Sequence, residues 1–151
     1  GVNLICCWQT ARAAAHLMKA SGGGSIVTMS SLSAFTGAGS SPAYAASKAA
    51  LNTLTLSLAR ALAPDVRVNA VCPGYVDTRW GRRGIGDDGY DAFTTALTQQ
   101  LPLKRMVVAD DIAETVLWFL AGGTAITGQT LVVDSGEHLA GGISITASDE
   151  T

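Results

Sequence analysis

A phenol and an ammonium group separated by one helical turn are the most informative feature of this chain. Tyr44 precedes Lys48 by four residues, so the two side chains share one face if the segment is helical. An adjacent cation favours the phenolate and lowers the pKa of a tyrosine from its usual value of about 10. Tyr44 is therefore predicted to be a general acid or base. Ser31, thirteen residues earlier, is placed to hold a substrate oxygen, which suits proton exchange with a carbonyl or alcohol while a cofactor carries the hydride.

Helix-like and strand-like patterns alternate along the chain. Strands are predicted at 25–30, 66–71 and 129–134, with helices over about 2–20, 42–63, 90–100 and 110–120 and a Ser/Gly-rich loop at 31–41. Strands separated by helices imply parallel pairing and a doubly wound α/β sheet. Ligands of such sheets bind beyond the carboxyl ends of the strands. The predicted fold therefore brings Ser31, Tyr44 and Pro73 to the same rim.

Composition narrows the classes of function. The 151 residues fit one domain, and 48% of them are hydrophobic while 15% are charged, which is typical of a compact α/β protein. A net charge of −2 without a basic stripe argues against nucleic acid as a partner. The sequence shows neither a membrane span nor a signal peptide. Three cysteines without disulfide or zinc spacing indicate a reducing cytoplasm, and His16 and His138 lack partners at ligand spacing, so no metal site is predicted.

Four blocks of sequence follow one another in a fixed order. They are residues 24–31 (GSIVTMSS), 44–51 (YAASKAAL), 67–78 (RVNAVCPGYVDT) and 126–134 (ITGQTLVVD). With these blocks the chain resembles the C-terminal part of the short-chain dehydrogenase/reductase family, from Val2 to about Gly136. The resemblance is nearest to reductases of the 3-oxoacyl-carrier-protein type, and it implies a Rossmann-like fold.

Two sequence features of that family do not occur in this chain. They are the turn Thr-Gly-x-x-x-Gly-x-Gly, which wraps the cofactor pyrophosphate, and the block Asn-Asn-Ala-Gly. Residues 22–24 are three glycines without that spacing and are interpreted as a helix-to-strand turn. Residues 1–151 are therefore expected to be a single partial domain. It would be the catalytic half of a Rossmann-type dehydrogenase, with the N-terminal nucleotide-binding strands and the Gly-rich turn missing.

The resemblance implies roles for four catalytic residues. Tyr44 would be the proton donor in ketone reduction and the proton acceptor in alcohol oxidation. Lys48 would lower the pKa of Tyr44 and hydrogen-bond the nicotinamide ribose. Ser31 would donate a hydrogen bond to the substrate oxygen, with Ser30 as its rival for that role. Asn3 would anchor a water molecule on a proton relay to the lysine.

A second set of residues is implied to bind the cofactor. Pro73, Gly74, Val76 and Thr78 match the family's Pro-Gly-x-Val-x-Thr loop beside the nicotinamide, and Tyr44 and Lys48 are expected to contact the cofactor as well. Val76 would reach the carboxamide through its backbone, and Thr78 would use its hydroxyl there or contact the pyrophosphate. The segment from about 76 to 104 matches the variable substrate lid of the family. Tyr75 and the pair at 79–80 are expected to line the substrate pocket.

The leading functional hypothesis is an NAD(P)-dependent oxidoreductase of the cytoplasm that interconverts a ketone or aldehyde with an alcohol. Its substrate is expected to be a small molecule, and its cofactor is NAD or NADP. The sequence does not distinguish the two, because the discriminating residues follow a strand that this chain does not contain. The resemblance also implies a homodimer or homotetramer formed through two long helices.

The alternative hypothesis is a non-catalytic fragment that folds or self-associates without binding cofactor. A sheet that lacks strands exposes an apolar edge, which favours association. The 151-residue chain by itself is accordingly expected to be inactive. A Ser/Lys hydrolase is disfavoured, because its nucleophilic serine would stand three residues before Lys48, where the chain has Ala45.

Overall fold

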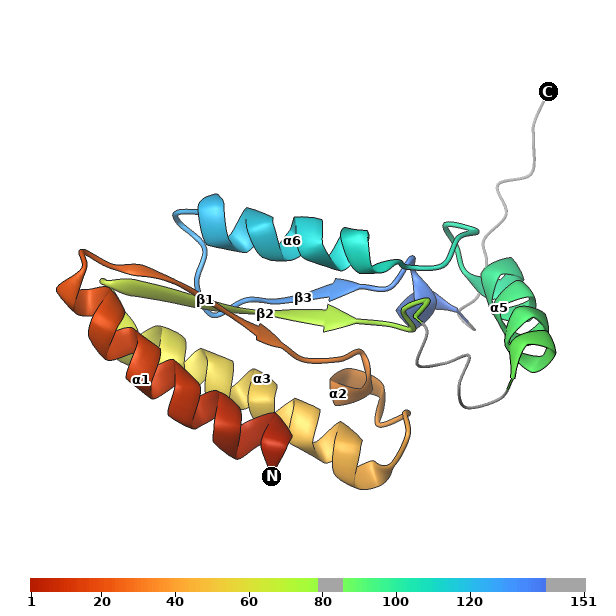
Figure 1. The fold of residues 1–151 in the computed structure, drawn as a ribbon, viewed down its shortest axis with the longest axis horizontal. Coiled ribbons are helices and arrows are strands. Elements are labelled where there is room, and N and C mark those ends of the chain that lie inside the picture. Colours follow the sequence, from red (N-terminus) through yellow and green to blue (C-terminus); the bar gives the residue numbers. More distant parts are fainter. Residues whose placement is uncertain (79–85, 141–151) are drawn as a thin grey trace, which may run out of the picture.

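The computed structural model describes residues 1–78 and 86–140, and these form one parallel sheet with helices packed on it (Figure 1). The elements in chain order are η1 (Val2–Cys6, a π-helical turn), α1 (Cys7–Ala20), β1 (Gly24–Met29), α2 (Ser33–Thr36), α3 (Pro42–Leu62), β2 (Val66–Pro73), α5 (Asp87–Gln100), α6 (Ala109–Ala121), β3 (Thr130–Val133) and η2 (Glu137–Leu139, a 3-10 turn).

The strand order is β1-β2-β3, and both neighbouring pairs are parallel. Figure 1 shows α1 and α3 on one face of this sheet and α6 on the other. The residues of β2 are almost all buried, as expected for a strand that is covered on both faces. The prediction of a doubly wound parallel α/β sheet is thus confirmed. None of the described helices combines the length and the apolar character that crossing a membrane requires.

Two local predictions differ from the structure. The segment 31–41, predicted as a loop, contains the short helix α2, and the Ser31 hydroxyl just before it accepts from the backbone N–H of Ser33 at 3.2 Å. The strand predicted at 66–71 continues to Pro73, whose carbonyl accepts from the backbone N–H of Leu32 at 2.8 Å. A proline cannot donate to a ladder, but it can still accept. The predicted turn is present and ends at Gly23, whose N–H donates to the Met18 carbonyl at 2.8 Å, and Gly24 already begins β1.

The core lies between the sheet and the α1/α3 layer. The cluster of buried apolar side chains consists of Ala11, Leu58, Ala59, Val66 and Val68. Beside it, the hydroxyls of Thr28 on β1 and Thr55 on α3 are buried and lie 2.8 Å apart, so each satisfies the other where water has no access. On the opposite face Phe119 of α6 is buried, whereas its neighbour Trp118 is 49% exposed.

Asn69 in β2 joins this strand to the loop that leads into β3. The side chain is fully buried; its Nδ2 donates to the Ile126 carbonyl at 3.1 Å, and its Oδ1 accepts from the Gln129 N–H at 3.0 Å. Replacing Asn69 by Leu leaves two backbone groups without these partners, so we expect the free energy of unfolding to fall by about 3 kcal/mol. Urea denaturation followed by circular dichroism measures this.

The matched control is Asn52→Leu, because within residues 1–78 and 86–140 the Asn52 side chain makes only a long contact of 3.8 Å with the Cys72 sulfur. That variant should lose less than about 1 kcal/mol. Equal losses in the two variants would contradict the structural role that we assign to Asn69.

Candidate active site

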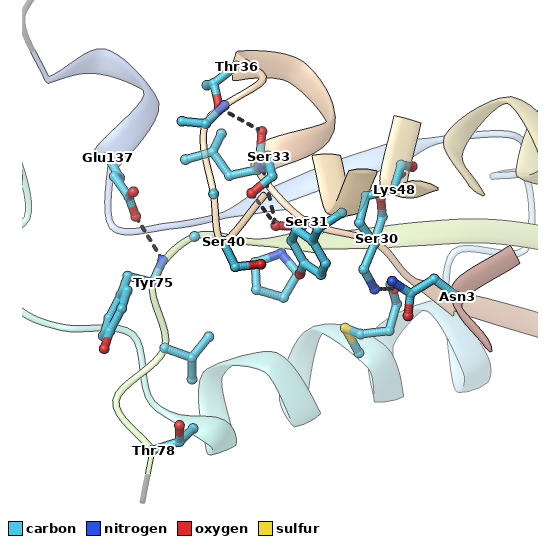
Figure 2. Close-up of a pocket in the computed structure, with 18 residues that line it drawn as sticks. Asn3, Ser30, Ser31, Ser33, Thr36, Ser40, Lys48, Tyr75, Thr78 and Glu137 are labelled. Carbon is cyan, nitrogen blue, oxygen red and sulfur yellow. Dashed lines mark hydrogen bonds between the residues drawn. The ribbon is translucent and has the colours of Figure 1, made fainter. Parts of the chain in front are cut away.

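The structure brings every residue of the predicted site to one cleft at the carboxyl ends of the strands. The cleft has a volume of about 880 Å³, which is within the range of sites for small molecules and cofactors. The predicted residues that line it are Asn3, Ser31, Tyr44, Lys48, Pro73, Gly74, Val76 and Thr78. Of these, Figure 2 labels Asn3 from η1, Ser31 after β1, Lys48 from α3 and Thr78 after β2, and shows them around one space.

Tyr44 and Lys48 are held at the first two turns of α3. Ser41 is the N-cap of this helix, and its hydroxyl accepts from the Tyr44 N–H at 3.1 Å, which is the usual way of satisfying a free amide at a helix start. The Lys48 ammonium lies 5.6 Å from the centre of the Tyr44 ring and donates to the Met29 carbonyl at 2.7 Å. A single cation therefore bridges the aromatic ring and the end of β1.

Ser31 is positioned by backbone pairing that continues beyond the end of β1. The Ser30 N–H donates to the Val71 carbonyl at 2.8 Å, and the Leu32 N–H donates to the Pro73 carbonyl at 2.8 Å. The Ser31 hydroxyl lies 3.2 Å from the Ser33 hydroxyl and lines the cleft. The rival Ser30 is buried, and its hydroxyl donates to the Lys48 carbonyl at 3.2 Å, so it serves to join β1 to α3.

Asn3 reaches the cleft from the π-helical turn η1, and its partner is a residue that the sequence did not single out. Its Nδ2 donates to the Ser47 hydroxyl at 3.0 Å, and that hydroxyl donates to the Tyr44 carbonyl at 2.7 Å. The hydrogen bond from Asn3 to Ser47 connects η1 to α3 at a position between Tyr44 and Lys48. A hydroxyl placed directly before Lys48 was the available signal for this role.

The loop after β2 is fixed at several backbone positions. Val76 makes an isolated parallel bridge with Val107, and the Asp77 N–H donates to the Val107 carbonyl at 2.8 Å. The Thr78 N–H donates to the Tyr90 hydroxyl at 3.3 Å. This bonding holds the predicted cofactor loop against the segment that precedes α6.

Tyr90 of α5 is a positioning residue that sequence reasoning missed. Its ring is fully buried, and its hydroxyl donates to Asp77 Oδ1 at 2.7 Å. Burial, together with the hydrogen bond to this carboxylate, raises the pKa of Tyr90 to about 12, so the hydroxyl keeps its proton. Tyr90 lies in the segment 76–104 predicted as a lid. The pair predicted at 79–80 lies outside the described residues, whereas Tyr75 lines the cleft as predicted.

Glu137 also lines the cleft and was not predicted. It belongs to η2, just after β3, and its Oε2 accepts from the Tyr75 N–H at 2.8 Å (Figure 2). The Tyr75 ring packs edge-on against Phe93 with centroids 4.9 Å apart. The only sequence signal was the position of Glu137 shortly after a strand end, where the ligands of such sheets bind.

Other groups capable of chemistry are engaged elsewhere in the described part of the chain. The Cys72 thiol is buried, and burial raises its pKa, so it stays protonated. His138 Nδ1 lies 2.7 Å from Asp134 Oδ2. Within residues 1–78 and 86–140, no three His, Cys, Asp or Glu side chains come together to hold a metal ion.

Comparisons with known proteins identify relatives over most of the chain. A family model described as enoyl-(acyl carrier protein) reductase matches residues 1–138. A protein of Streptomyces violaceoruber, assigned as ketoacyl reductase 2 of the granaticin polyketide synthase, is 41% identical over 139 residues. YusR of Bacillus subtilis, a short-chain dehydrogenase/reductase homologue, is 41% identical over 129 residues. A crystal structure from Burkholderia xenovorans, assigned to the short-chain dehydrogenases/reductases, is 44% identical with a TM-score of 0.81.

The lengths of these proteins differ. The matches cover 92%, 85% and 91% of this chain, respectively. The chain spans about half of the granaticin protein and of the Burkholderia structure, 54% and 53%, but 95% of YusR.

Proposed function

The chain belongs to the short-chain dehydrogenase/reductase family, and on this basis we propose that it serves in the NAD(P)-dependent interconversion of a ketone or aldehyde with an alcohol. One observation carries the proposal. Ser31, which follows β1, and Tyr44 and Lys48, which both belong to α3, line a single cleft at the carboxyl ends of the strands. A hydroxyl, a phenol and an ammonium around one space are the groups that proton exchange with a carbonyl oxygen requires.

The donors around the cleft fit the nicotinamide end of the cofactor. In the described part of the chain only the Met29 carbonyl accepts from the Lys48 ammonium, which has three N–H donors, so two of them are available to ribose hydroxyls. The Thr78 hydroxyl and the backbone of Val76 lie on the same cleft. The bound nicotinamide would exchange the hydride with the substrate carbon.

The names of two relatives support a nicotinamide cofactor but do not distinguish NAD from NADP. A solved small-chain dehydrogenase in complex with NADPH is 32% identical with a TM-score of 0.69. The L-rhamnose 1-dehydrogenase of Azotobacter vinelandii, 38% identical, is named for NAD(P)+. Because the sequence contains no Gly-rich turn with pyrophosphate-binding spacing, we propose that the 151 residues alone do not turn over substrate.

Each protein group has a distinct task in the proposed reaction. In reduction, the Tyr44 hydroxyl gives its proton to the carbonyl oxygen while the Ser31 hydroxyl donates a hydrogen bond to the same oxygen. The Lys48 ammonium, 5.6 Å from the Tyr44 ring centre, stabilises the phenolate that remains. In oxidation the same groups act in reverse, and Tyr44 accepts the alcohol proton. Asn3, through Ser47, keeps the Tyr44 turn in place.

Removal of the Ser31 hydroxyl isolates one part of this mechanism. We expect Ser31→Ala to lower kcat by about a hundredfold, because a donor to the developing oxyanion is lost, while cofactor affinity stays unchanged. Steady-state kinetics and a fluorescence titration with NADPH measure the two quantities in the natural protein that contains these residues. Ser40→Ala, which removes a hydroxyl elsewhere in the cleft, should change kcat far less. A larger loss in Ser40→Ala would reassign the oxyanion donor.

Substrate identity is left open by the relatives. Besides a sugar dehydrogenase, they include a 3alpha-hydroxysteroid dehydrogenase of Mediterraneibacter gnavus that is 40% identical. These names share only the carbonyl/alcohol pair, so the proposed substrate class is a small molecule bearing that pair. The decisive assay follows NAD(P)H absorbance with a panel of such compounds, using the natural protein that contains these residues, and absence of turnover with every member would contradict the proposed function.

A second candidate is a chain that folds or self-associates without cofactor. Its support is an apolar groove of about 440 Å³ between α1 and β1. Among the described residues β1 pairs only with β2, so its other edge has no partner strand. NADH fluorescence unchanged by the protein, together with self-association in sedimentation, would favour this candidate.

Assembly and localisation are proposed on similar grounds. Exposed apolar side chains on α1 and α3, among them Leu17 and Leu56, support a homodimer or homotetramer through these helices. Free Cys6, Cys7 and Cys72 support a cytoplasmic location. Sedimentation equilibrium tests the first proposal.

A further inference from the structure

Glu137 is the feature of the cleft that the proposed reaction leaves without a task. Of the described residues that line the cleft, only Lys48 and Glu137 carry charged side chains. In Figure 2 they lie on either side of Ser31, with Glu137 beside Tyr75 and Lys48 beside Asn3. The anionic end is therefore separated from the cation that the proposed mechanism uses.

The turn that carries Glu137 is held firmly. Asp134 is buried and accepts three hydrogen bonds: Gly136 N–H at 2.9 Å on Oδ1, and the His138 N–H and ring nitrogen, each at 2.7 Å, on Oδ2. Burial opposes ionisation of Asp134, but these hydrogen bonds outweigh it and lower the pKa of the carboxyl. Gly136 has a φ of +85°, and a Cβ there would lie 2.7 Å from the Pro102 ring. The position of Glu137 is thus set by its neighbours.

One carboxylate oxygen of Glu137 is committed to the protein and the other is available. Oε2 accepts from the Tyr75 N–H at 2.8 Å, and Gly74 makes room for it, since a Cβ on Gly74 would lie 2.5 Å from this atom. No described residue donates to Oε1. Every buried side-chain oxygen in the described part of the chain has a partner, so Oε1 is in accessible space, where a ligand can meet it.

The chemistry of this position selects among ligands. An ionised carboxylate only accepts hydrogen bonds, so it binds a hydroxyl or a cation and repels another carboxylate or a phosphate. The same cleft carries the side chains of Ser33 and Ser40, whose hydroxyls can both give and take hydrogen bonds. A ligand with several hydroxyl groups matches such a wall, because each of its groups can also do both.

We propose that Glu137 accepts a hydrogen bond from a non-reacting hydroxyl of the substrate, so that the substrate is a neutral polyhydroxylated compound of the sugar or polyol class. This inference rests on the proposed oxidoreductase function and narrows it. Tyr75 and Gly74 act here as positioning residues, because they fix one oxygen of the carboxylate and leave the other for the ligand.

The test compares three hexoses that differ in one group. D-glucose is neutral, D-glucuronate carries a carboxylate and D-glucosamine carries an ammonium group. Their dissociation constants are measured by saturation-transfer NMR on the natural protein that contains these residues, on its Glu137→Gln variant and on the control Glu114→Gln. The glutamine keeps an oxygen for the Tyr75 N–H and replaces the other with an amide donor. Glu114 is exposed on α6 and does not line the cleft.

We expect wild type to bind glucose at least about tenfold more tightly than glucuronate. Glu137→Gln should reduce this preference by about tenfold, because the amide N–H now donates a hydrogen bond to the carboxylate of glucuronate. Glu114→Gln should keep the wild-type ratio. Far-UV circular dichroism of each variant verifies that it remains folded.

Three results would overturn the inference. An unchanged ratio in folded Glu137→Gln means that Glu137 serves only the Tyr75 N–H. A preference for glucosamine over glucose that disappears in the variant means that the carboxylate recognises a cation. Failure of all three hexoses to bind contradicts the proposal that the substrate is a sugar. Because binding is measured without cofactor, these results are independent of turnover, so a failed oxidoreductase assay and a failed hexose test remain distinguishable.

Discussion

Tyr44→Phe is expected to lower turnover by about a thousandfold or more, while the affinity for NAD(P)H changes by less than about twofold. The substitution removes only the hydroxyl that exchanges the proton. The aromatic ring, whose centre lies 5.6 Å from the Lys48 ammonium, stays in place, and the backbone N–H still bonds to Ser41. The loss should therefore appear in the chemical step. Single-turnover absorbance measurements and a cofactor fluorescence titration, both on the natural protein that contains these residues, separate the two effects.

The matched control for this experiment is Tyr75→Phe. It removes a phenol hydroxyl from the same cleft and preserves the ring that packs edge-on against Phe93. Turnover in this variant should stay within about threefold of wild type, since a residue outside the proton path contributes little to the barrier. Near-normal turnover in Tyr44→Phe would overturn the proposed mechanism.

Lys48→Met is expected to impair both chemistry and binding. Loss of the cation removes the stabilisation of the Tyr44 phenolate, and kcat should fall by about a thousandfold. Loss of the ammonium donors should also weaken NAD(P)H binding by about tenfold, whereas Tyr44→Phe leaves binding intact. Kinetics and cofactor titration in the same natural protein provide both numbers. The two variants together thus distinguish a proton donor from a group with two tasks.

Lys19→Met provides the control for removal of a lysine. Lys19 is at the end of α1, where it pairs with Asp65 at 3.3 Å on the surface, and exposed pairs of this kind contribute little. Turnover and cofactor affinity should match wild type. If Lys48→Met lost turnover but kept full cofactor affinity, the lysine would act on Tyr44 alone, and the proposed contact with the ribose would be wrong.

The elements and the central trio were predictable because their signals are local. Periodicity and breakers located β1, α3 and the other main elements within a few residues, and the spacing of Tyr44 and Lys48 on one helix is short enough to be read directly. Ser31 was predicted from the family resemblance, with which its position just past a predicted strand agrees. Helix α2 was missed because it is only four residues long and lies in a Ser/Gly-rich segment, a composition that favours a loop.

The remaining site residues depend on contacts between distant parts of the chain. The Glu137 carboxylate meets the Tyr75 backbone across 62 residues, and Asn3 meets Ser47 across 44. No local pattern records such a meeting. Tyr90 belongs to the lid segment, where the family resemblance offers no residue-level correspondence, and its role became visible only from its buried bond to Asp77. Residues that hold other residues in place are thus the least visible in a single sequence.

Lys48 ties α3 to the end of β1 twice, through its ammonium on the Met29 carbonyl and through its own carbonyl on the Ser30 hydroxyl. Only the hydrogen bond to the Met29 carbonyl needs a lysine side chain. This hydrogen bond would still stabilise the fold of a protein without catalytic activity. A descendant that lost its activity would still be selected to keep the lysine. The presence of this lysine in a related sequence is therefore poor proof of an active enzyme, and retention of the Tyr44 hydroxyl is the more telling sign.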